Sequence, residues 1–203
     1  MDVDTRLNSC TLADLQTGRV ATTMLPRLSG EGLVFSRVRT ARCAAGDILG
    51  AMEAIDRVQP GEVLLFGVLG NDEPHCFLGD NMAFAAAARG ALGFVIDGYL
   101  RDLSGIRELG LTVHARGQAM GDASASGPFD LEGPVTIDGV EFRTGDGIAL
   151  DDDGIARFPF DQLDTLLAEA DAVLAREKAV RDAIRAGQTL REAHRSVGYS
   201  YGG

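Results

Sequence analysis

The sequence is short of several features that mark common classes of protein. It has three cysteines in 203 residues, Cys10, Cys43 and Cys76, which are odd in number, far apart and outside any C-x-x-C spacing. This pattern predicts reduced thiols in a cytoplasmic protein rather than a disulfide framework. No apolar run approaches the length of a membrane-spanning helix, because Arg89 interrupts the best candidate. The acidic residues 1–4 are not followed by the apolar segment that a secretory signal needs.

Basic residues and familiar catalytic motifs are also scarce. Lysine and arginine together number 19, against 30 aspartates and glutamates, and the formal net charge is −11. Since nucleic-acid binding needs a basic surface, we expect neither nucleic acid nor a membrane among the partners. His75, His114 and His194 are scattered, without the spacing of an H-E-x-x-H metal motif. A glycine-rich phosphate loop and a G-x-S-x-G elbow are both missing from the sequence.

The patterns that are present predict one domain built from alternating strands and helices. The hydrophobic content of 45% over this length is enough for a sizeable core. Residues 129–158 are β-rich, with hairpin-turn signals at Asp138-Gly139, Gly145-Asp146-Gly147 and Asp153-Gly154. The sequence therefore predicts an α/β protein, a single-domain mixed α/β sandwich over residues 1–203. The expected helices cover residues 12–17, 48–58, 82–88 and 104–109, and the expected strands 33–43, 63–69, 94–96 and 111–115.

The residues with the most chemical potential lie between positions 79 and 102. Gly79 and Asp80 open an alanine-rich helix. The apolar residues 94–96 then predict a strand that is buried on both faces. Arg101 and Asp102 follow this strand closely, and charges at such a place are costly unless they meet a metal, a ligand or each other. The pattern predicts a site made from a helix N-terminus and the end of a strand.

These residue types suit a metal-assisted site for a small carboxylate. The N–H groups of Asn81 and Met82 at the helix start can receive an anion. Arg101 can hold a carboxylate through two parallel hydrogen bonds. Asp80 and Asp102 are hard oxygen ligands of the kind that Mg²⁺ or Mn²⁺ prefers. The expected ligand is a 2-oxo acid that chelates the metal through its carboxylate and keto oxygens.

Each of these residues also has a structural interpretation. Asp80 could serve only as the N-cap of its helix. Arg101 could form an ion pair with Asp97 or Asp102. Asp102 could cap the short helix expected at 104–109. Taken one at a time these interpretations are the more common ones, and it is the combination that favours a functional site.

Asp80, twenty intervening residues and then Arg101-Asp102 resemble the D-x20-R-D signature of the 4-hydroxy-4-methyl-2-oxoglutarate aldolase / RraA-like family. Other motifs follow in the family's order over most of the chain. The resemblance implies an RraA-like fold and a lyase that depends on Mg²⁺ or Mn²⁺ and releases pyruvate. Its reaction would be retro-aldol cleavage of a 4-hydroxy-2-oxo diacid, decarboxylation of oxaloacetate, or both. Asp102 would hold the metal directly and Asp80 through water, while Arg101, Asn81 and Met82 bind the substrate. The matching motifs are Pro60-Gly61-Glu62-Val63, Ala88-Arg89-Gly90, Asp97-Gly98, Thr144-Gly145-Asp146 and Asp151-Asp152-Asp153-Gly154.

A long helix is expected over residues 160–186, and one of its acids bears on function. Glu177 continues an apolar stripe of the helix, where an acid needs a partner. The resemblance implies that Glu177 reaches, through water, the metal of a neighbouring subunit's site, with a homotrimer or hexamer as the working form. The helical segment 160–203 would then lie at a subunit interface. The alternative is a solvated helix residue with no part in the site. The stripe consists of Leu163, Leu166, Leu167, Ala170, Val173 and Leu174.

Two other functions compete with the lyase. RraA-like proteins include binding proteins that regulate a ribonuclease and lack the catalytic aspartates, and the presence of Asp80, Arg101 and Asp102 together argues against that function. A diverged lyase or hydratase on another oxo- or hydroxy-acid is the third possibility. The sequence departs from the family at Gly105, where an acid is usual, and at Asn81, where an aliphatic residue is usual. The single lysine, Lys178, lies in the expected C-terminal helix, which disfavours a Schiff-base aldolase.

Overall fold

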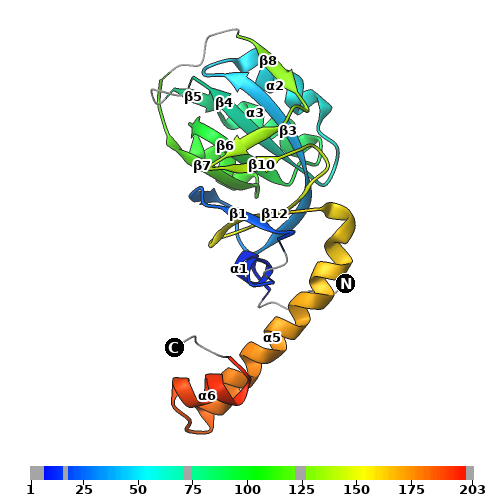
Figure 1. Cartoon of the computed structure of the whole chain (residues 1–203). Coiled ribbons are helices and arrows are strands. Elements are labelled where there is room, and N and C mark those ends of the chain that lie inside the picture. The colour runs from blue at the N-terminus through cyan, green and yellow to red at the C-terminus, as the bar shows by residue number, and fades with distance from the viewer. Residues whose placement is uncertain (1–6, 16–17, 71–74, 122–126, 200–203) are drawn as a thin grey trace.

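The structure is a computed structural model that describes residues 7–15, 18–70, 75–121 and 127–199. A large sheet forms its centre, in the strand order β1-β12-β11-β3-β4-β6-β7-β2 (Figure 1). The middle strands β3, β4, β6 and β7 run parallel, whereas the outer strands β11, β12, β1 and β2 pair antiparallel with their neighbours. The bounds are β1 (Ala21–Thr23), β2 (Arg27–Ser29), β3 (Val34–Ala44), β4 (Glu62–Leu69), β6 (Gly93–Leu100), β7 (Thr112–Gln118), β11 (Gly147–Asp151) and β12 (Gly154–Phe158).

Three helices connect the parallel strands and cover one face of the sheet. They are α2 (Ile48–Arg57), α3 (Asp80–Ala88) and α4 (Leu103–Glu108). Side chains alternate between the two faces of a strand, so every second residue of β4 points to these helices. Leu64 and Phe66 of β4 accordingly belong to one apolar cluster with Ala54 of α2 and Ala83 of α3.

A hairpin covers the opposite face. It consists of β9 (Val135–Ile137) and β10 (Val140–Phe142), which pair antiparallel as a separate two-stranded sheet. Val63 and Leu65, the alternate residues of β4, pack there in a second cluster with Val135 and Phe142. The central strands are therefore buried on both faces, and the predicted mixed α/β sandwich is confirmed.

Two of the three predicted hairpin turns are present, whereas the segment around Gly145-Asp146-Gly147 joins β10 to β11, which belong to different sheets and do not pair. Asp138 and Gly139 join β9 to β10 with φ values of 47° and 84°, the left-handed conformation that the favoured two-residue hairpin turn requires. The second turn joins β11 to β12, with Asp151 opposite Gly154. The carboxylate of Asp151 accepts the backbone N–H groups of Asp153 and Gly154 at 3.0 and 3.2 Å. It also accepts the hydroxyl of Ser9, from α1 (Ser9–Ala13), at 2.7 Å.

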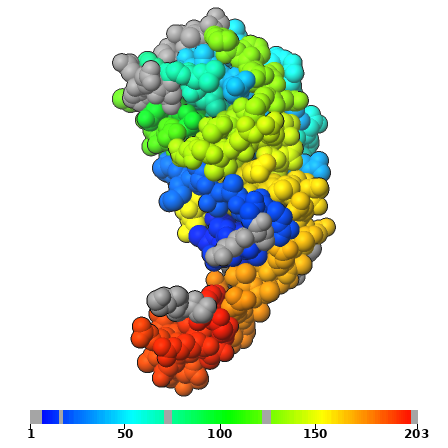
Figure 2. Space-filling view, in the orientation of Figure 1, coloured from blue at the N-terminus to red at the C-terminus, as the bar shows by residue number. Residues whose placement is uncertain are grey.

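The C-terminal part of the chain forms a helical arm. After the short turn η1 (Phe160–Gln162), α5 (Leu163–Arg185) leaves the body and leads to α6 (Leu190–Ser196). Figures 1 and 2 show α5 and α6 projecting away from the sheet. The predicted apolar stripe is confirmed where α5 meets the body, since Leu166, Ala170 and Leu174 are buried. None of the described helices is long and apolar enough to cross a membrane.

Candidate active site

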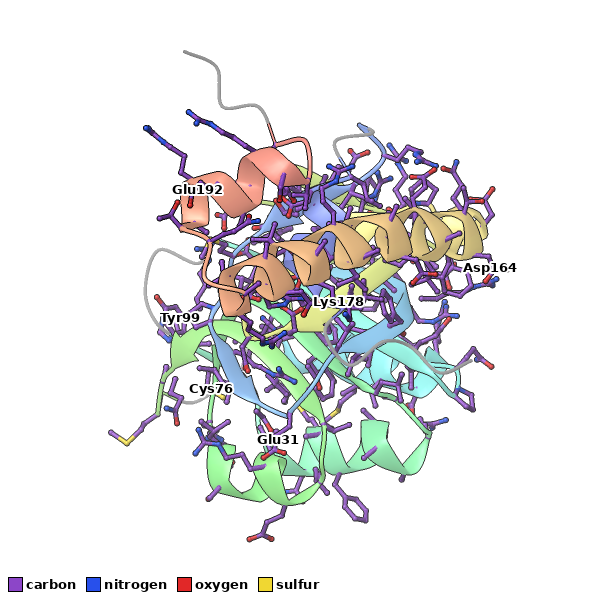
Figure 3. The ribbon with its side chains drawn as sticks, turned by 90° about the horizontal axis from the view of Figure 1, so that it is seen from below. Glu31, Cys76, Tyr99, Asp164, Lys178 and Glu192 are labelled. Carbon is purple, nitrogen blue, oxygen red and sulfur yellow. The ribbon has the colours of Figure 1, made fainter. Side chains whose placement is uncertain are left out.

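The start of α3 and the end of β6 are brought together by the short strand β5 (Cys76–Leu78). This strand pairs parallel with the end of β6, with Cys76 opposite Tyr99, and both residues are labelled at one edge of the molecule in Figure 3. The backbone N–H of Arg101 donates to the carbonyl oxygen of Leu78 at 3.0 Å. Because α3 starts two residues after Leu78, this pairing places Asp80 beside the Arg101-Asp102 dipeptide.

Gly79 is the residue that allows this close approach. It is the N-cap of α3, and no side chain caps the helix. A Cβ atom at Gly79 would lie 2.9 Å from Oδ2 of Asp102 and 3.5 Å from Nε of Arg101, so any larger residue would displace the Asp102 carboxylate. The first N–H groups of α3 thus have no capping side chain, an arrangement that favours an anion. The interpretation of Asp80 as an N-cap is wrong, since Asp80 is the first residue of the helix.

Asp102 has an unusual backbone conformation. Its φ and ψ are 57° and 35°, in the left-handed region that residues other than glycine rarely adopt. Asp102 is the N-cap residue of α4, but its side chain makes no capping hydrogen bond. The interpretation of Asp102 as a capping side chain is therefore wrong. A strained residue with a carboxylate directed elsewhere is typical of functional sites.

Arg101 and Asp102 form an ion pair across 3.3 Å between Nε and Oδ2. Their side chains are 44% and 46% exposed, so the pair is partly solvated. Exposed pairs of this kind contribute at most about 1 kcal/mol to stability, which leaves both groups able to exchange partners with a ligand. Asp97, the other predicted partner of Arg101, is instead ion-paired with Arg116.

A cavity of about 190 Å³ lies over this group of residues. At about 30 Å³ for each water molecule, it has room for roughly six waters, and hence for a ligand of a few heavy atoms. Its lining contains all five predicted residues of the chain's own site, together with apolar residues that include Ile48 and Met52, one turn apart on α2. The cavity is lined by Ile48, Met52, Cys76, Phe77, Gly79, Asp80, Asn81, Met82, Arg101 and Asp102.

Several lining residues were missed by the sequence analysis. Ile48 and Met52 carry no signal in their residue types. Only the strand order shows that α2, which follows the parallel strand β3, starts where ligands of α/β sheets bind, outside the carboxyl ends of the strands. Cys76 is buried in the wall. Burial raises the pKa of the Cys76 thiol, while the nearby Arg101 guanidinium acts in the opposite direction. A raised pKa favours the protonated thiol, which is a poor nucleophile, so we assign Cys76 to the wall of the cavity.

Gly105, the departure from the family pattern, lies against Asp80. A Cβ atom at position 105 would be 3.1 Å from Cβ of Asp80 and 3.2 Å from its Oδ2. A side chain there would press directly on the Asp80 carboxylate. With glycine at position 105, no side chain from α4 presses on the Asp80 carboxylate at this point.

The carboxylates of the cavity match the needs of Mg²⁺ better than those of zinc. In the described part of the chain, no three His, Cys, Asp or Glu side chains are grouped closely enough to hold a metal ion. Zinc usually needs three or four protein ligands. Mg²⁺, in contrast, is bound by one or two carboxylates and keeps several waters. Asp80 and Asp102, both in the cavity wall, supply that number of carboxylates.

Glu177 lies on α5, in the projecting arm, and is not among the residues that line the cavity. Its carboxylate is 35% exposed and accepts a hydrogen bond from Nη1 of Arg181 at 3.4 Å, one turn further along the helix. Glu177 thus has a local partner within the chain. Its predicted contact with a neighbouring subunit stays a prediction.

Comparison with known proteins identifies the family of the chain. Residues 9–157 match the model of the RraA-like family, described as Aldolase/RraA. A protein of Halalkalibacterium halodurans with the provisional name 4-hydroxy-4-methyl-2-oxoglutarate aldolase is 30% identical over 169 residues, which cover 81% of this chain and 80% of that protein.

Two solved structures share the fold. A crystal structure of an uncharacterised Pseudomonas syringae protein matches with a TM-score of 0.80 at 24% identity, over 94% of this chain and 90% of that one. Streptomyces coelicolor RraAS2, described as an unusual member of the RNase ES inhibitor RraA protein family, matches with a TM-score of 0.72 at 26% identity, over 88% and 93% of the two chains. The family model and the sequence relative together show that this chain belongs to the RraA-like family.

Proposed function

We propose that the protein is a divalent-metal-dependent lyase that cleaves a 2-oxo acid and releases pyruvate. The observation that carries this proposal is the lining of one cavity by a guanidinium, two carboxylates and the uncapped start of a helix. The substrate would be a 4-hydroxy-2-oxo diacid, oxaloacetate, or both. The pyruvyl half of these substrates agrees in size with a cavity of about 190 Å³, below the usual range of about 300–1,000 Å³ for drug-sized ligands.

Arg101 and the first amides of α3 have the same task in both reactions. They bind the substrate carboxylate, Arg101 through two parallel hydrogen bonds and Asn81 and Met82 through their backbone N–H groups. When the bond between C3 and C4 breaks, its electron pair stays on C3 and the oxo-acid half becomes an enolate. Positive groups already in place stabilise that developing charge. The enolate then takes a proton at C3 and leaves as pyruvate.

The other half of the substrate leaves in one of two forms. In the retro-aldol reaction the 4-hydroxyl group loses its proton and becomes a carbonyl. In the decarboxylation the C4 carboxylate leaves as CO₂. The cavity wall contains no histidine among the described residues, so Asp80, the carboxylate that does not hold the metal directly, accepts the hydroxyl proton through water in this proposal.

Asp102, with Asp80 acting through water, would hold Mg²⁺ or Mn²⁺. When bound, such an ion supplies Lewis-acid polarisation of the keto oxygen. The donor set fits, since both carboxylates belong to the same wall and both are hard oxygen donors. The Asp102 carboxylate makes no capping hydrogen bond to α4, although Asp102 is the N-cap residue of that helix.

A second copy of the chain completes the site in this proposal. Glu177 would come from the arm of a neighbouring subunit and reach the metal through water, in a homotrimer or hexamer. Two features support this: Glu177 lies in the part of the chain that projects from the body, and it is only partly buried in its own subunit.

One comparison favours a second function, the binding and regulation of a ribonuclease. Streptomyces coelicolor RraAS2, a member of an RNase inhibitor family, has the same fold at 26% identity. A binding protein needs no cavity with a guanidinium and two carboxylates, so we rank this function below the lyase.

The lyase is tested by pyruvate release from oxaloacetate with Mg²⁺ or Mn²⁺, measured above the background of the metal alone. We expect release by the wild type, its loss in EDTA, and a decrease of about 10²–10³-fold in Arg101→Ala, as for removal of one donor to a developing oxyanion. Arg89→Ala is the matched control, because the Arg89 side chain is 45% exposed and ion-paired with Asp56 on the surface. Wild-type release equal to the metal background would exclude the lyase and favour the binding function.

A further inference from the structure

A second cavity adjoins the candidate active site. It has a volume of about 530 Å³ and is lined by Leu100, Arg101, Asp102, Gln118, Ala119 and Met120. Arg101 and Asp102 line both this cavity and the smaller one. Arg101 and Asp102, which carry the proposed chemistry, therefore lie between a smaller and a larger cavity.

The position of Gln118 next to this boundary is fixed by strand pairing. Gln118 is the last residue of β7 and lies opposite Leu100, the last residue of β6, in the parallel register. The backbone N–H of Ala119 donates to the carbonyl oxygen of Leu100 at 3.0 Å, which holds the chain beyond β7 against the start of Arg101-Asp102. Gln118 therefore lies on the neighbouring strand, opposite the residue that directly precedes Arg101.

The side chain of Gln118 is exposed, and its carboxamide makes no hydrogen bond with any other described residue. A carboxamide offers two N–H donors and a carbonyl acceptor. Its neighbours in the cavity wall, Leu100, Ala119 and Met120, are apolar or present only backbone polar groups. Among the described residues of this wall, Gln118 is the polar side chain besides Arg101 and Asp102.

We propose that the second cavity is the subsite for the leaving half of the substrate, and that Gln118 binds an oxygen of that half. This inference rests on the proposed function. The pyruvyl half occupies the smaller cavity, with its carboxylate on Arg101 and on the start of α3. The bond to be broken then lies over Asp102, and the carbon skeleton beyond C4 extends toward Gln118.

The two reactions of the proposed function make different use of this subsite. Oxaloacetate ends at C4, so its leaving group, CO₂, has no atoms that extend to Gln118. A 4-hydroxy-2-oxo acid of five or more carbons leaves as an aldehyde or ketone, and that fragment fills the second cavity. In this proposal the second cavity takes part only in retro-aldol cleavage of the longer acids, whereas decarboxylation uses the smaller cavity alone.

The test compares two substrates in the same variants of the full-length protein. Pyruvate release is measured from 4-hydroxy-4-methyl-2-oxoglutarate and from oxaloacetate with Mg²⁺. In Gln118→Ala we expect kcat/KM for the longer acid to fall about tenfold, the effect of one lost hydrogen bond to a charged or strongly polarised oxygen. For oxaloacetate the expected change is less than about twofold. Gln118→Asn, which keeps the amide, should restore part of the loss.

Gln188→Ala is the matched control, since Gln188 is an exposed glutamine between α5 and α6, outside both cavities. Equal losses for both substrates in Gln118→Ala would show a structural role and overturn the subsite. An unchanged kcat/KM for the longer acid would do the same. A wild type that acts on oxaloacetate but not on the longer acid would also overturn it, with the lyase function intact. Release from neither substrate would remove the lyase and the subsite together.

Discussion

The body and the C-terminal arm of this chain are stabilised by different kinds of contact. In the body, the sheet is buried between three helices on one face and the β9–β10 hairpin on the other. Beyond Leu174, the arm buries only Val180 and Ala193 among its described apolar residues. It relies instead on local interactions, such as the Lys178–Asp182 ion pair at 2.6 Å and the capping box formed by Thr189 and Glu192.

Because of this difference in packing, the body can hold a site of fixed geometry and the arm cannot. The candidate site depends on close backbone contacts between β5, β6 and α3, which only a densely packed body can fix. The arm, held by local contacts, carries Glu177 outside the cavity of its own subunit, so the proposed role of Glu177 requires a second chain. The residues that match the family model, 9–157, end where the arm begins.

The largest expected contrast is in stability. Phe66 is fully buried between Phe77 and Phe94, with ring centroids 5.0 and 6.3 Å away. Phe66→Ala should lower the free energy of unfolding by about 3–5 kcal/mol. Thr189→Ala removes the N-cap of α6 and should cost about 1 kcal/mol, confined to that helix. Denaturant unfolding measures the change in Phe66→Ala, and hydrogen exchange in α6 measures the change in Thr189→Ala. An equal loss of global unfolding free energy in the two variants would contradict the comparison of body and arm.

The next prediction concerns a substitution in the body that should lower activity but not stability. Gly79→Ala puts a Cβ atom 2.9 Å from Oδ2 of Asp102, a side-chain atom that can move. We expect the melting temperature to change little and pyruvate release to fall about a hundredfold, as for a misplacement of about 1 Å in a reacting group. Gly93→Ala should instead prevent folding. The added Cβ would lie 1.9 Å from the backbone oxygen of Thr112, which cannot move aside as a side chain can. Full activity in Gly79→Ala would show that the position of Asp102 is unimportant.

A smaller effect tests whether the arm takes part in the site. Glu177→Gln should reduce turnover about tenfold, the usual loss for an outer partner of a metal site, without changing the oligomer measured by light scattering. Asp171→Asn, an exposed acid on the same helix, is the control and should leave the rate unchanged. If the two variants are equally active, Glu177 is a solvated helix residue and the body works without the arm.

The smallest effect concerns a buried histidine of the body. His114 is fully buried on β7, and its Nδ1 is 2.9 Å from the carbonyl oxygen of Leu25, so Nδ1 carries the proton of the neutral ring. Burial lowers the pKa of His114 from its ordinary value of 6.5. The unfolded chain therefore binds a proton that the folded chain excludes, and stability falls as the pH falls below about 6.5. Thermal unfolding between pH 7.5 and 5 should show a shallower loss in His114→Gln; an identical slope would remove His114 as the cause.

The sequence predicted the long elements well because they carry their own patterns. The helix expected at 48–58 is observed at Ile48–Arg57, and the strand expected at 63–69 at Glu62–Leu69. The three-residue strands β1, β2 and β5 were not predicted, since strands so short are defined by their pairing partners. The strand expected at 94–96 extends to Gly93–Leu100, because β5 pairs with residues beyond the apolar run.

The polar side of the candidate site could be predicted and its apolar side could not. Asp80, Arg101 and Asp102 stand out as charges next to a buried strand. Ile48 and Met52 have the same residue types as any core helix, and only the strand order shows that α2 faces the cavity. The need for glycine at position 79 follows from a contact with Asp102, which is 23 positions away in sequence and became visible only in the structure.

The central claim is that Asp80, Arg101 and Asp102 form one site for a metal and a 2-oxo acid. It is tested most directly by a crystal grown with Mn²⁺ and oxalate, a stable mimic of the pyruvate enolate, and by its anomalous difference map. We predict one manganese peak at about 2 Å from the Asp102 carboxylate, with oxalate bound to Arg101. A peak elsewhere, or a cavity that takes up oxalate without Arg101, would contradict the account.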